Sequence, residues 1–261
     1  MQPLRLCLSH DNKRLFVTDG GNNRILVLNR ADGTLIQTIG NGEGTGPGQF
    51  KSPWGVCIST NGRELYAADK NNHRIQVFNA IDGSYARTIG HGQLKYPRAV
   101  CVSGNGEELY VSDYKDIKVL RVADGTHLRT IDEHLVDPDG LCLSYDNELL
   151  FVADQTKIVV FRASDGSYVR SIFSRRGDGE DIDVELSDIY LSPSGEELYV
   201  TDGLYNRVQV LRADDGSFIQ NIGDYGQGPG QFVTPLGVCV SRDGELIVAD
   251  TWNYRIQVFQ L

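Results

Sequence analysis

One acidic residue recurs through the chain at a spacing that could serve catalysis or metal binding. It closes a short apolar segment each time, at intervals of 50, 44, 41, 48 and 48 residues. The six copies are Asp19, Asp69, Asp113, Asp154, Asp202 and Asp250. In five copies a cation follows five residues later (Arg24, Arg74, Lys118, Arg207 and Arg255), and Lys157 follows Asp154 by three. Because each carboxylate keeps its own cation, we expect six structural residues that accept N–H bonds from turns and lie beside the cation.

Five cysteines and five histidines are the other residues of a type that binds metal ions. The cysteines share one repeat position, at Cys7, Cys57, Cys101, Cys142 and Cys239, and Tyr190 takes that position once. Zinc needs ligands that converge to about 2.3 Å from one ion, whereas these thiols lie on separate repeats, as small buried hydrophobes do. His73, His91 and His134 fall in loops of one face, but nothing in their spacing makes them converge. We therefore predict no metal site, no cofactor and no catalytic residue; no Gly-x-Ser-x-Gly elbow occurs either.

A glycine-rich loop at 40–50, GNGEGTGPGQF, raises the question of a phosphate site. It contains no G-x-G-x-x-G and no Gly-Lys-Ser/Thr, and no helical pattern follows it whose N-terminus could face an anion. A close copy, GDYGQGPGQF, occupies 223–232. We interpret both loops as connectors between repeats.

The recurring aspartate belongs to a longer repeat that fills the chain. Residues 3–40 and 53–90 align along their length, and the same frame starts again at Pro97, Pro138 and Leu186, then at Pro235. Each copy holds four short segments rich in Val, Ile, Tyr and Phe, bounded by Gly, Asn and Asp, which is the pattern of strands and turns. Because a four-stranded unit of about 43 residues cannot bury both faces alone, we predict an all-β fold, a six-bladed β-propeller. The expected domain is 1–261, with blades at about 3–40, 53–90, 97–131, 138–173, 186–223 and 235–261.

The repeat resembles a known family. The run P-x-G-V-C-V-S … L-Y-V-A-D-x-x-N-x-R-I-Q-V-F … D-G-S … I-G is similar to the NHL repeat, and the connector G-P-G-Q-F-x-x-P occurs at 46–53 and 228–235. This resemblance implies a propeller that is usually six-bladed. It leaves the function open, because members of the family serve as protein-interaction platforms, as RNA-binding domains or, in one related branch, as a peptide-amidating lyase.

The sixth copy departs from the pattern because it stops after its third segment, at Phe259-Gln260-Leu261. No spare strand precedes Pro3, so we expect a three-stranded last blade with Arg255–Leu261 as an open edge. Such edges tend to recruit a strand. We expect the parent protein or a crystal contact to supply it.

Charge and composition limit the kinds of partner and the cellular compartment that we expect. The net charge of -10 argues against a nucleic-acid partner, which needs a basic surface. No apolar run reaches the roughly 20 residues that span a bilayer, so we expect no membrane contact. The chain has no signal-peptide pattern, no Asn-x-Ser/Thr sequon and an odd number of cysteines, so we predict a cytoplasmic protein, provided no targeting signal lies in a longer parent protein.

Propeller connectivity places two kinds of loop on what we call the top face: the turns between strands two and three of a blade, and the connectors between blades. These loops vary most and carry exposed aromatic residues, as binding loops on a rigid scaffold do. The predicted partner-binding residues are Trp54, Arg98, Asp139, Tyr114, Tyr205, Trp252 and Tyr254. Phe50 and Phe232 have matched positions, so we expect them to anchor connectors. The top face should be dipolar, with cations near blades two and three and acids at 132–139 and 175–185.

Four functions stay open on the sequence alone. The leading prediction is a non-catalytic module that binds a protein or peptide on the top face. The alternatives are a metal-dependent lyase or lactonase-like enzyme, an RNA-binding domain, and a structural or sensory domain of a larger receptor.

Overall fold

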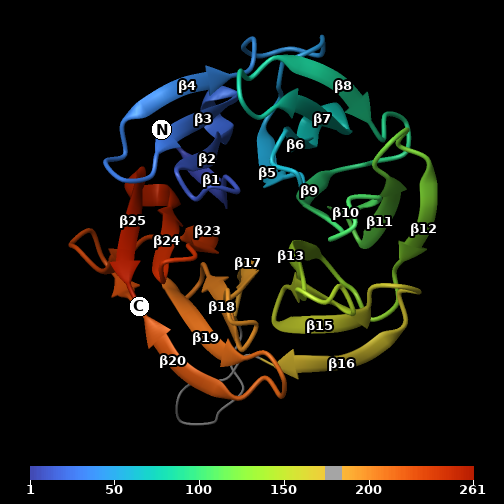
Figure 1. Cartoon of the computed structure of the whole chain (residues 1–261). Helices are drawn as coiled ribbons and strands as arrows, with labels where there is room; N and C mark the ends of the chain where they lie inside the picture. The colour runs from blue at the N-terminus through green and yellow to red at the C-terminus, as the bar shows by residue number, and fades with distance from the viewer. Residues whose placement is uncertain (174–183) are drawn as a thin grey trace. The chain divides into compact units, whose positions relative to one another are not determined.

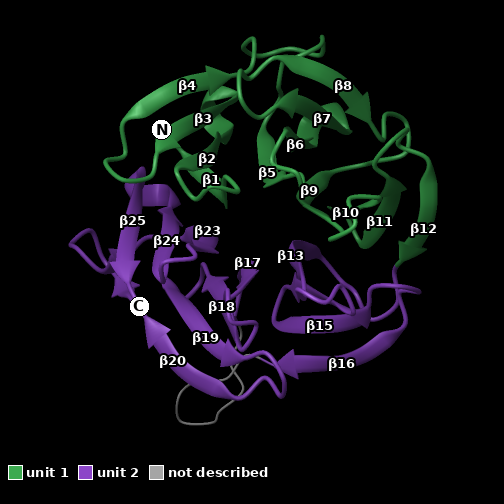
Figure 2. Cartoon of the chain, viewed as in Figure 1, with its two compact units in different colours: residues 1–131 green, residues 132–261 purple. Residues whose placement is uncertain are grey.

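The computed structural model describes residues 1–173 and 184–261. The fold is all-β, a six-bladed β-propeller whose last blade has three strands, as predicted. The chain divides into two compact units, Met1–Ile131 and Asp132–Leu261 (Figure 2). The expectation of a single domain over 1–261 stays a prediction. Within the described residues, no helix is long and apolar enough to cross a bilayer.

The first unit contains three blades, each a four-stranded antiparallel sheet in chain order (Figure 1). Blade one holds β1 (Pro3–Leu8), β2 (Arg14–Asp19), β3 (Arg24–Asn29) and β4 (Leu35–Ile39). Blade two holds β5 (Pro53–Ile58), β6 (Glu64–Asp69), β7 (Arg74–Asn79) and β8 (Tyr85–Ile89). Blade three holds β9 (Pro97–Val102), β10 (Glu108–Asp113), β11 (Asp116–Arg121) and β12 (His127–Ile131). Short 3-10 turns, η1 (Gly20–Asn22) and η2 (Lys70–Asn72), join strands two and three of the first two blades.

The second unit repeats this plan with one strand fewer (Figure 2). Blade four holds β13 (Pro138–Leu143), β14 (Leu149–Asp154), β15 (Lys157–Arg162) and β16 (Tyr168–Phe173). Blade five holds β17 (Leu186–Leu191), β18 (Glu197–Asp202), β19 (Arg207–Arg212) and β20 (Phe218–Ile222). Blade six holds β23 (Pro235–Val240), β24 (Glu245–Asp250) and β25 (Arg255–Gln260), with η3 (Thr251–Asn253) between the last two. A short parallel pair, β21 (Asp224–Tyr225) and β22 (Gln231–Phe232), lies in the connector before it.

The core of each unit lies between neighbouring blades, because a propeller sheet has two apolar faces to bury. Between blades one and two, Phe16 and Val27 pack with Leu65 and Phe78, all essentially unexposed. The connector residue Phe50 enters this cluster, with its ring centroid 5.3 Å from that of Phe78. In the second unit Phe232 is buried in the same way, 5.7 Å from Phe259. Phe50 and Phe232 therefore anchor the connectors to which they belong.

Candidate functional site

A buried carboxylate fixes the top-face turn of blade two. Asp69, unexposed at the end of β6, accepts the backbone N–H of Lys51 at 2.7 Å. Its Oδ2 accepts Asn72 Nδ2 at 2.9 Å, Arg74 Nε at 2.9 Å and Gln76 Nε2 at 3.0 Å. Both carboxylate oxygens are thus occupied by donors, and the group is shielded from water. This arrangement suits a residue that fixes the turn better than one that transfers a proton, because proton transfer needs access to a substrate.

The guanidinium of Arg74 extends the same network into the glycine-rich loop. Its Nη1 donates to Thr45 O, and its Nη2 donates to Gly46 O and Gln49 O, each at 2.8 Å. The blade-six connector is held in the same way by Arg255, whose Nη2 donates to Gly228 O and Gln231 O at 2.7 and 2.8 Å. In both glycine-rich connectors, backbone carbonyl groups are therefore held by an arginine guanidinium.

The aspartate–arginine pair recurs in four blades. The Nε–Oδ2 distances are 2.9 Å for Arg24–Asp19, 2.9 Å for Arg74–Asp69, 3.0 Å for Arg207–Asp202 and 2.8 Å for Arg255–Asp250. Several of these carboxylates also accept the backbone N–H of a residue ahead of their own blade, as Asp19 does from Gln2 and Asp250 from Val233. Each such aspartate joins the entry of its blade to the turn of that blade.

Blades three and four differ from the predicted pairing. Lys118 was expected beside Asp113, but its Nζ lies 2.8 Å from Asp116 Oδ2. The physical reason is the short turn: Asp113 pairs directly with Asp116 in the β10–β11 ladder, so Lys118 is the third residue of β11 and not its first. In blade four Lys157 Nζ donates to His134 O at 2.9 Å. Asp113 and Asp154 keep the connector bonds, to Lys95 N and Val136 N among others.

Within the described residues, Asp113 in blade three has no arginine partner, and the pKa of its carboxyl is shifted in the opposite direction from that of Asp19 in blade one. Burial alone would raise the pKa of Asp19, but hydrogen bonds from Gln2, Asn22 and Arg24 outweigh it, and the pKa is lowered. Burial raises the pKa of Asp113, because the N–H groups of Lys95 and Tyr96 do not compensate for it fully. As pH falls, the Asp113 carboxyl therefore takes up a proton before the Asp19 carboxyl does, because its pKa is the higher of the two.

Thiols and imidazoles are placed apart from this network. All five cysteines are free, and burial raises the pKa of Cys57 and Cys101 well above the usual value. His73 Nδ1 hydrogen-bonds Lys95 O, and the ring of His134 lies 4.1 Å from that of Tyr168. Among residues 1–173 and 184–261, no three side chains of His, Cys, Asp or Glu are grouped as metal ligands.

A line of aromatic and basic side chains crosses the top face of blades two and three. We call it the aromatic strip, made of Trp54, Lys70, His73, Lys95, Tyr96, Tyr114 and Lys115. Lys70 Nζ lies 3.7 Å from the ring centroid of Trp54. The ring centroids of His73 and Tyr96 are 5.3 Å apart, and those of Tyr96 and Tyr114 are 6.2 Å apart. Lys95 and Lys115 place their Nζ atoms 5.8 and 5.5 Å from the Tyr114 centroid.

The structure places three predicted partner-binding residues in the first unit. Trp54 is the second residue of β5 and is half-buried, and Arg98 is the second residue of β9 and is also half-buried. Tyr114 is 43% exposed in the two-residue turn between β10 and β11, with its backbone in the left-handed region at φ 62°. Trp54 and Tyr114 lie at opposite ends of the aromatic strip.

The other four predicted residues lie in the second unit. Tyr205, Trp252 and Tyr254 are 43%, 56% and 59% exposed in the turns before β19 and β25. The guanidinium of Arg207 lies 5.0 Å from the Tyr205 centroid. Asp139, the second residue of β13, is half-buried. Of the acidic run at 175–185, residues 175–183 lie outside the described residues.

Sequence reasoning missed the middle of the aromatic strip. Tyr96, a connector residue, is absent from the predicted partner-binding residues, and His73 is considered there only as a metal ligand. Their proximity depends on Asp113, which accepts the N–H of Tyr96 at 2.5 Å and so draws the connector onto blade three. Tyr96 precedes Pro97, and an aromatic residue at that point of a connector is the signal that could have found it.

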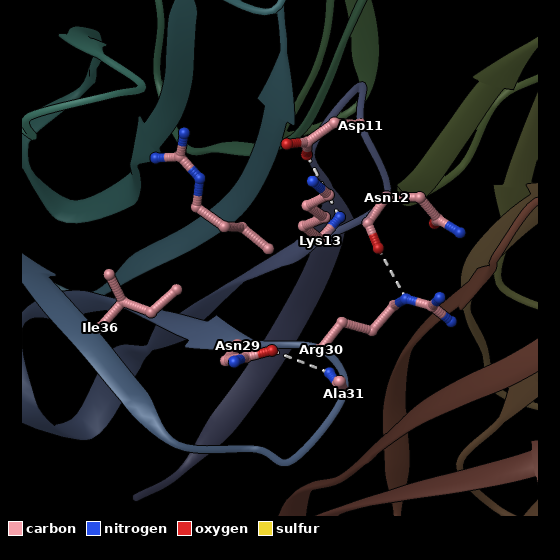
Figure 3. Close-up of a pocket in the computed structure, with 8 residues that line it drawn as sticks. Asp11, Asn12, Lys13, Asn29, Arg30, Ala31 and Ile36 are labelled. Atoms are coloured by element: carbon pink, nitrogen blue, oxygen red, sulfur yellow. Dashed lines mark hydrogen bonds between the residues drawn. The ribbon is translucent and has the colours of Figure 1, made fainter.

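A hollow of about 500 Å³ lies away from the top face, by the turns that close blade one at its other end. Asp11, Asn12 and Lys13 line one side, and Asn29, Arg30, Ala31 and Ile36 line the other (Figure 3). Arg14, which also lines it, donates to Ala80 O at 3.0 Å, and Arg30 Nε donates to Asn12 O at 2.6 Å. Both guanidinium groups therefore hold backbone carbonyls, which is a structural arrangement.

Comparisons with known proteins identify the repeat. A family model described as NHL repeat matches residues 50–78 and 232–259. The B-box type zinc finger protein ncl-1 of Caenorhabditis elegans is 54% identical over 37 residues, which are 14% of this chain and 4% of that protein. The E3 ubiquitin-protein ligase TRIM32 of Homo sapiens is 48% identical over 42 residues, 16% of this chain and 6% of that protein. The matched segments thus span a small part of these relatives.

A solved structure supports the fold over the whole chain. Hydrazine synthase of Kuenenia stuttgartiensis superposes with a TM-score of 0.74, covering 100% of this chain and 96% of that chain. Sequence identity is 14%, so the likeness concerns the fold alone. The chain is thus a six-bladed β-propeller that matches the NHL repeat at two positions, 50–78 and 232–259.

Proposed function

We propose that the protein is a non-catalytic interaction module that binds a protein or peptide partner on its top face. One observation carries the proposal: large aromatic side chains stand exposed on turns whose backbone is held by buried aspartates. Trp252 is 56% exposed, yet its turn begins at the unexposed Asp250 and its N–H bonds Val233 O. Exposed Trp and Tyr on a fixed backbone lose little freedom on binding, which is why they dominate interface energetics.

The relatives support a protein as the partner. A repeat similar to residues of this chain occurs in a protein named as a ubiquitin-protein ligase, an enzyme that acts on proteins. The matched segment is short, so the proposal rests mainly on the exposed aromatic residues.

The test is quantitative affinity capture with paired variants. Trp252→Ala combined with Tyr205→Ala removes two exposed rings from the top face of the second unit. The matched control is Tyr145→Ala combined with Ile81→Ala, which removes exposed apolar side chains from turns of the other face, 61% and 62% exposed. We expect partners recovered by the unmodified chain to fall by about tenfold with the first pair, since a central aromatic residue contributes roughly 1–2 kcal/mol or more.

Thermal unfolding of both variants checks that the fold is retained. Recovery of the same partners at the same level by the top-face pair, with loss in the control pair, would place the binding surface elsewhere.

A further inference from the structure

The top-face loops of blades two and three concentrate positive charge in a chain whose net charge is -10. Segments 51–54, 69–74, 90–98 and 113–116 contain the cations Lys51, Lys70, Arg74, Lys95, Arg98 and Lys115. Their only acids are Asp69, Asp113 and Asp116. Asp69 and Asp113 are buried within the turn networks, and Asp116 pairs with Lys118. The accessible charge of these loops is therefore basic.

These cations are held close to the rings of the aromatic strip. Lys70 lies over Trp54, and Lys95 and Lys115 lie on Tyr114. Among the described residues, the ammonium groups of Lys95 and Lys115 form no ion pair with a carboxylate. They remain available to a carboxylate supplied by a partner.

Hydrogen bonds join the loops that carry the strip. Asn71 N donates to Lys51 O, which ties η2 to the first connector. His73 hydrogen-bonds Lys95 O, which ties the turn of blade two to the second connector. Asp113 accepts Lys95 N and Tyr96 N, which ties that connector to the turn of blade three. A ligand that spans the strip therefore meets a surface that is already organised.

We propose that the aromatic strip binds an acidic segment of a protein partner. This inference rests on the proposed function and names the chemistry of the partner. Carboxylates of the segment pair with Lys95 and Lys115, and an apolar side chain packs on Tyr96, which is 45% exposed. Charge complementarity supplies the specificity and the association rate, and the rings supply contact area.

The ring geometry favours a peptide over a nucleic-acid strand. Single-stranded nucleic acids bind by stacking successive bases on exposed aromatic faces. Here the His73 and Tyr96 planes meet at 76° and the Tyr96 and Tyr114 planes at 50°. One pair is edge to face and the other is tilted, so the rings offer no run of parallel faces. The basic loops are also short, whereas a nucleic-acid strand needs an extended basic surface and the chain as a whole has a net charge of -10.

The experiment selects peptides from a displayed library of random 12-residue sequences against the whole chain. We expect the enriched sequences to contain more Asp and Glu than the input library. A synthetic peptide of the enriched sequence is then titrated by fluorescence anisotropy at two salt concentrations. Its binding should weaken as salt rises, because exposed charges are screened.

Two matched double variants locate the site. Lys95→Gln with Lys115→Gln should weaken binding of the acidic peptide by about fivefold, the combined effect of two exposed charge pairs. Lys13→Gln with Arg63→Gln removes the same charge from exposed positions of the other face and should leave binding unchanged. The inference is wrong if the enriched sequences are not acidic or if both double variants weaken binding equally. A 12-nucleotide poly(U) probe that binds through Lys95 and Lys115, when no acidic peptide does, also overturns it.

The same selection separates this inference from the proposed function. Non-acidic peptides that lose binding with Trp252→Ala would leave the interaction module standing and refute the acidic partner. A library with no enriched sequence would count against both.

Discussion

At the scale of the residue, blade three contains a three-part contact that makes stability depend on pH. Arg129 on β12 donates to both oxygens of Glu108 on β10, with Nη–Oε distances of 2.7 and 2.8 Å. The Tyr110 hydroxyl donates to Glu108 Oε2 at 2.7 Å. The hydrogen bond from Arg129 is the main cause that holds the pKa of Glu108 below its usual value.

The first prediction concerns Glu108→Gln. A carboxyl whose folded pKa is depressed stabilises the fold above its unfolded pKa, and this contribution is lost as pH falls through the folded value. We therefore expect the substitution to cost about 1 kcal/mol at pH 7 and almost nothing near pH 3, because the group is partly exposed and screened. Urea unfolding at both pH values measures the difference.

Blade five supplies the control for this prediction. Glu197 accepts the Tyr199 hydroxyl at 2.7 Å, but Gln220 occupies the place that Arg129 has in blade three. Glu197→Gln keeps the tyrosine contact and removes no arginine pair, so its cost should change less between pH 7 and pH 3. If the cost in unfolding free energy changed equally with pH for the two variants, the Arg129–Glu108 pair would not be its cause.

At the scale of the element, the inner strands of blades two and three pack so closely that residue 55 must be a glycine. A Cβ on Gly55 of β5 would lie 2.2 Å from Arg98 O and 2.8 Å from Ala99 Cα, both backbone atoms of β9. Backbone cannot give way as a flexible side chain does, so neighbouring blades must separate to admit a methyl group.

The second prediction is that Gly55→Ala destabilises the protein by about 1–3 kcal/mol, the usual cost of overpacking. Gly21→Ala is the matched control, because its Cβ would meet the far end of the Gln2 side chain, which can turn away. The free energy of unfolding in urea should fall for the first variant and change by about 0.5 kcal/mol or less for the second. A similar loss in both would show that the close approach of β5 and β9 is not the reason.

The sequence predicts those features of the strands and turns that recur in every copy of the repeat. Strand limits follow from the repeat, because apolar segments and turn residues recur in register. The aspartate–arginine pairs were visible as a fixed spacing of five residues, but the same spacing misled at Asp113 and Lys118, where the turn is shorter and the ladder shifts. Contacts between an aspartate and the connector ahead of its blade, such as Asp69 with Lys51, span 17 or 18 residues. Their donor is a backbone N–H, so no recurring residue type marks them in the sequence.

The aromatic strip was predicted only at its ends for a similar reason. Trp54 and Tyr114 stand out because their repeat positions vary, whereas His73 and Tyr96 become neighbours only through the packing of two blades. Such proximity is a property of tertiary structure.

At the scale of the whole molecule, the third strands of the six blades are not equally buried. The valine three residues after the start of strand three is unexposed in five of them: Val27, Val77, Val119, Val160 and Val210. Its counterpart on β25, Val258, is 53% exposed. The difference has a simple cause, since within the described residues blade six is the sheet β23-β24-β25 and no fourth strand pairs with β25.

The third prediction follows from this difference. Backbone N–H groups on the outer side of β25 lack a ladder partner, so they should exchange with solvent faster than those of β7 and β19, which are paired on both sides. Hydrogen exchange followed by mass spectrometry on peptides covering 255–260, 74–79 and 207–212 measures this, and we expect at least about tenfold faster exchange in the first. Val258→Thr should leave the unfolding free energy almost unchanged, whereas Val77→Thr should lower it by about 1–2 kcal/mol, because only the second places a hydroxyl in a closed core. If β25 proves as protected as β7, another chain covers its outer edge in solution, and the prediction of an open edge is wrong.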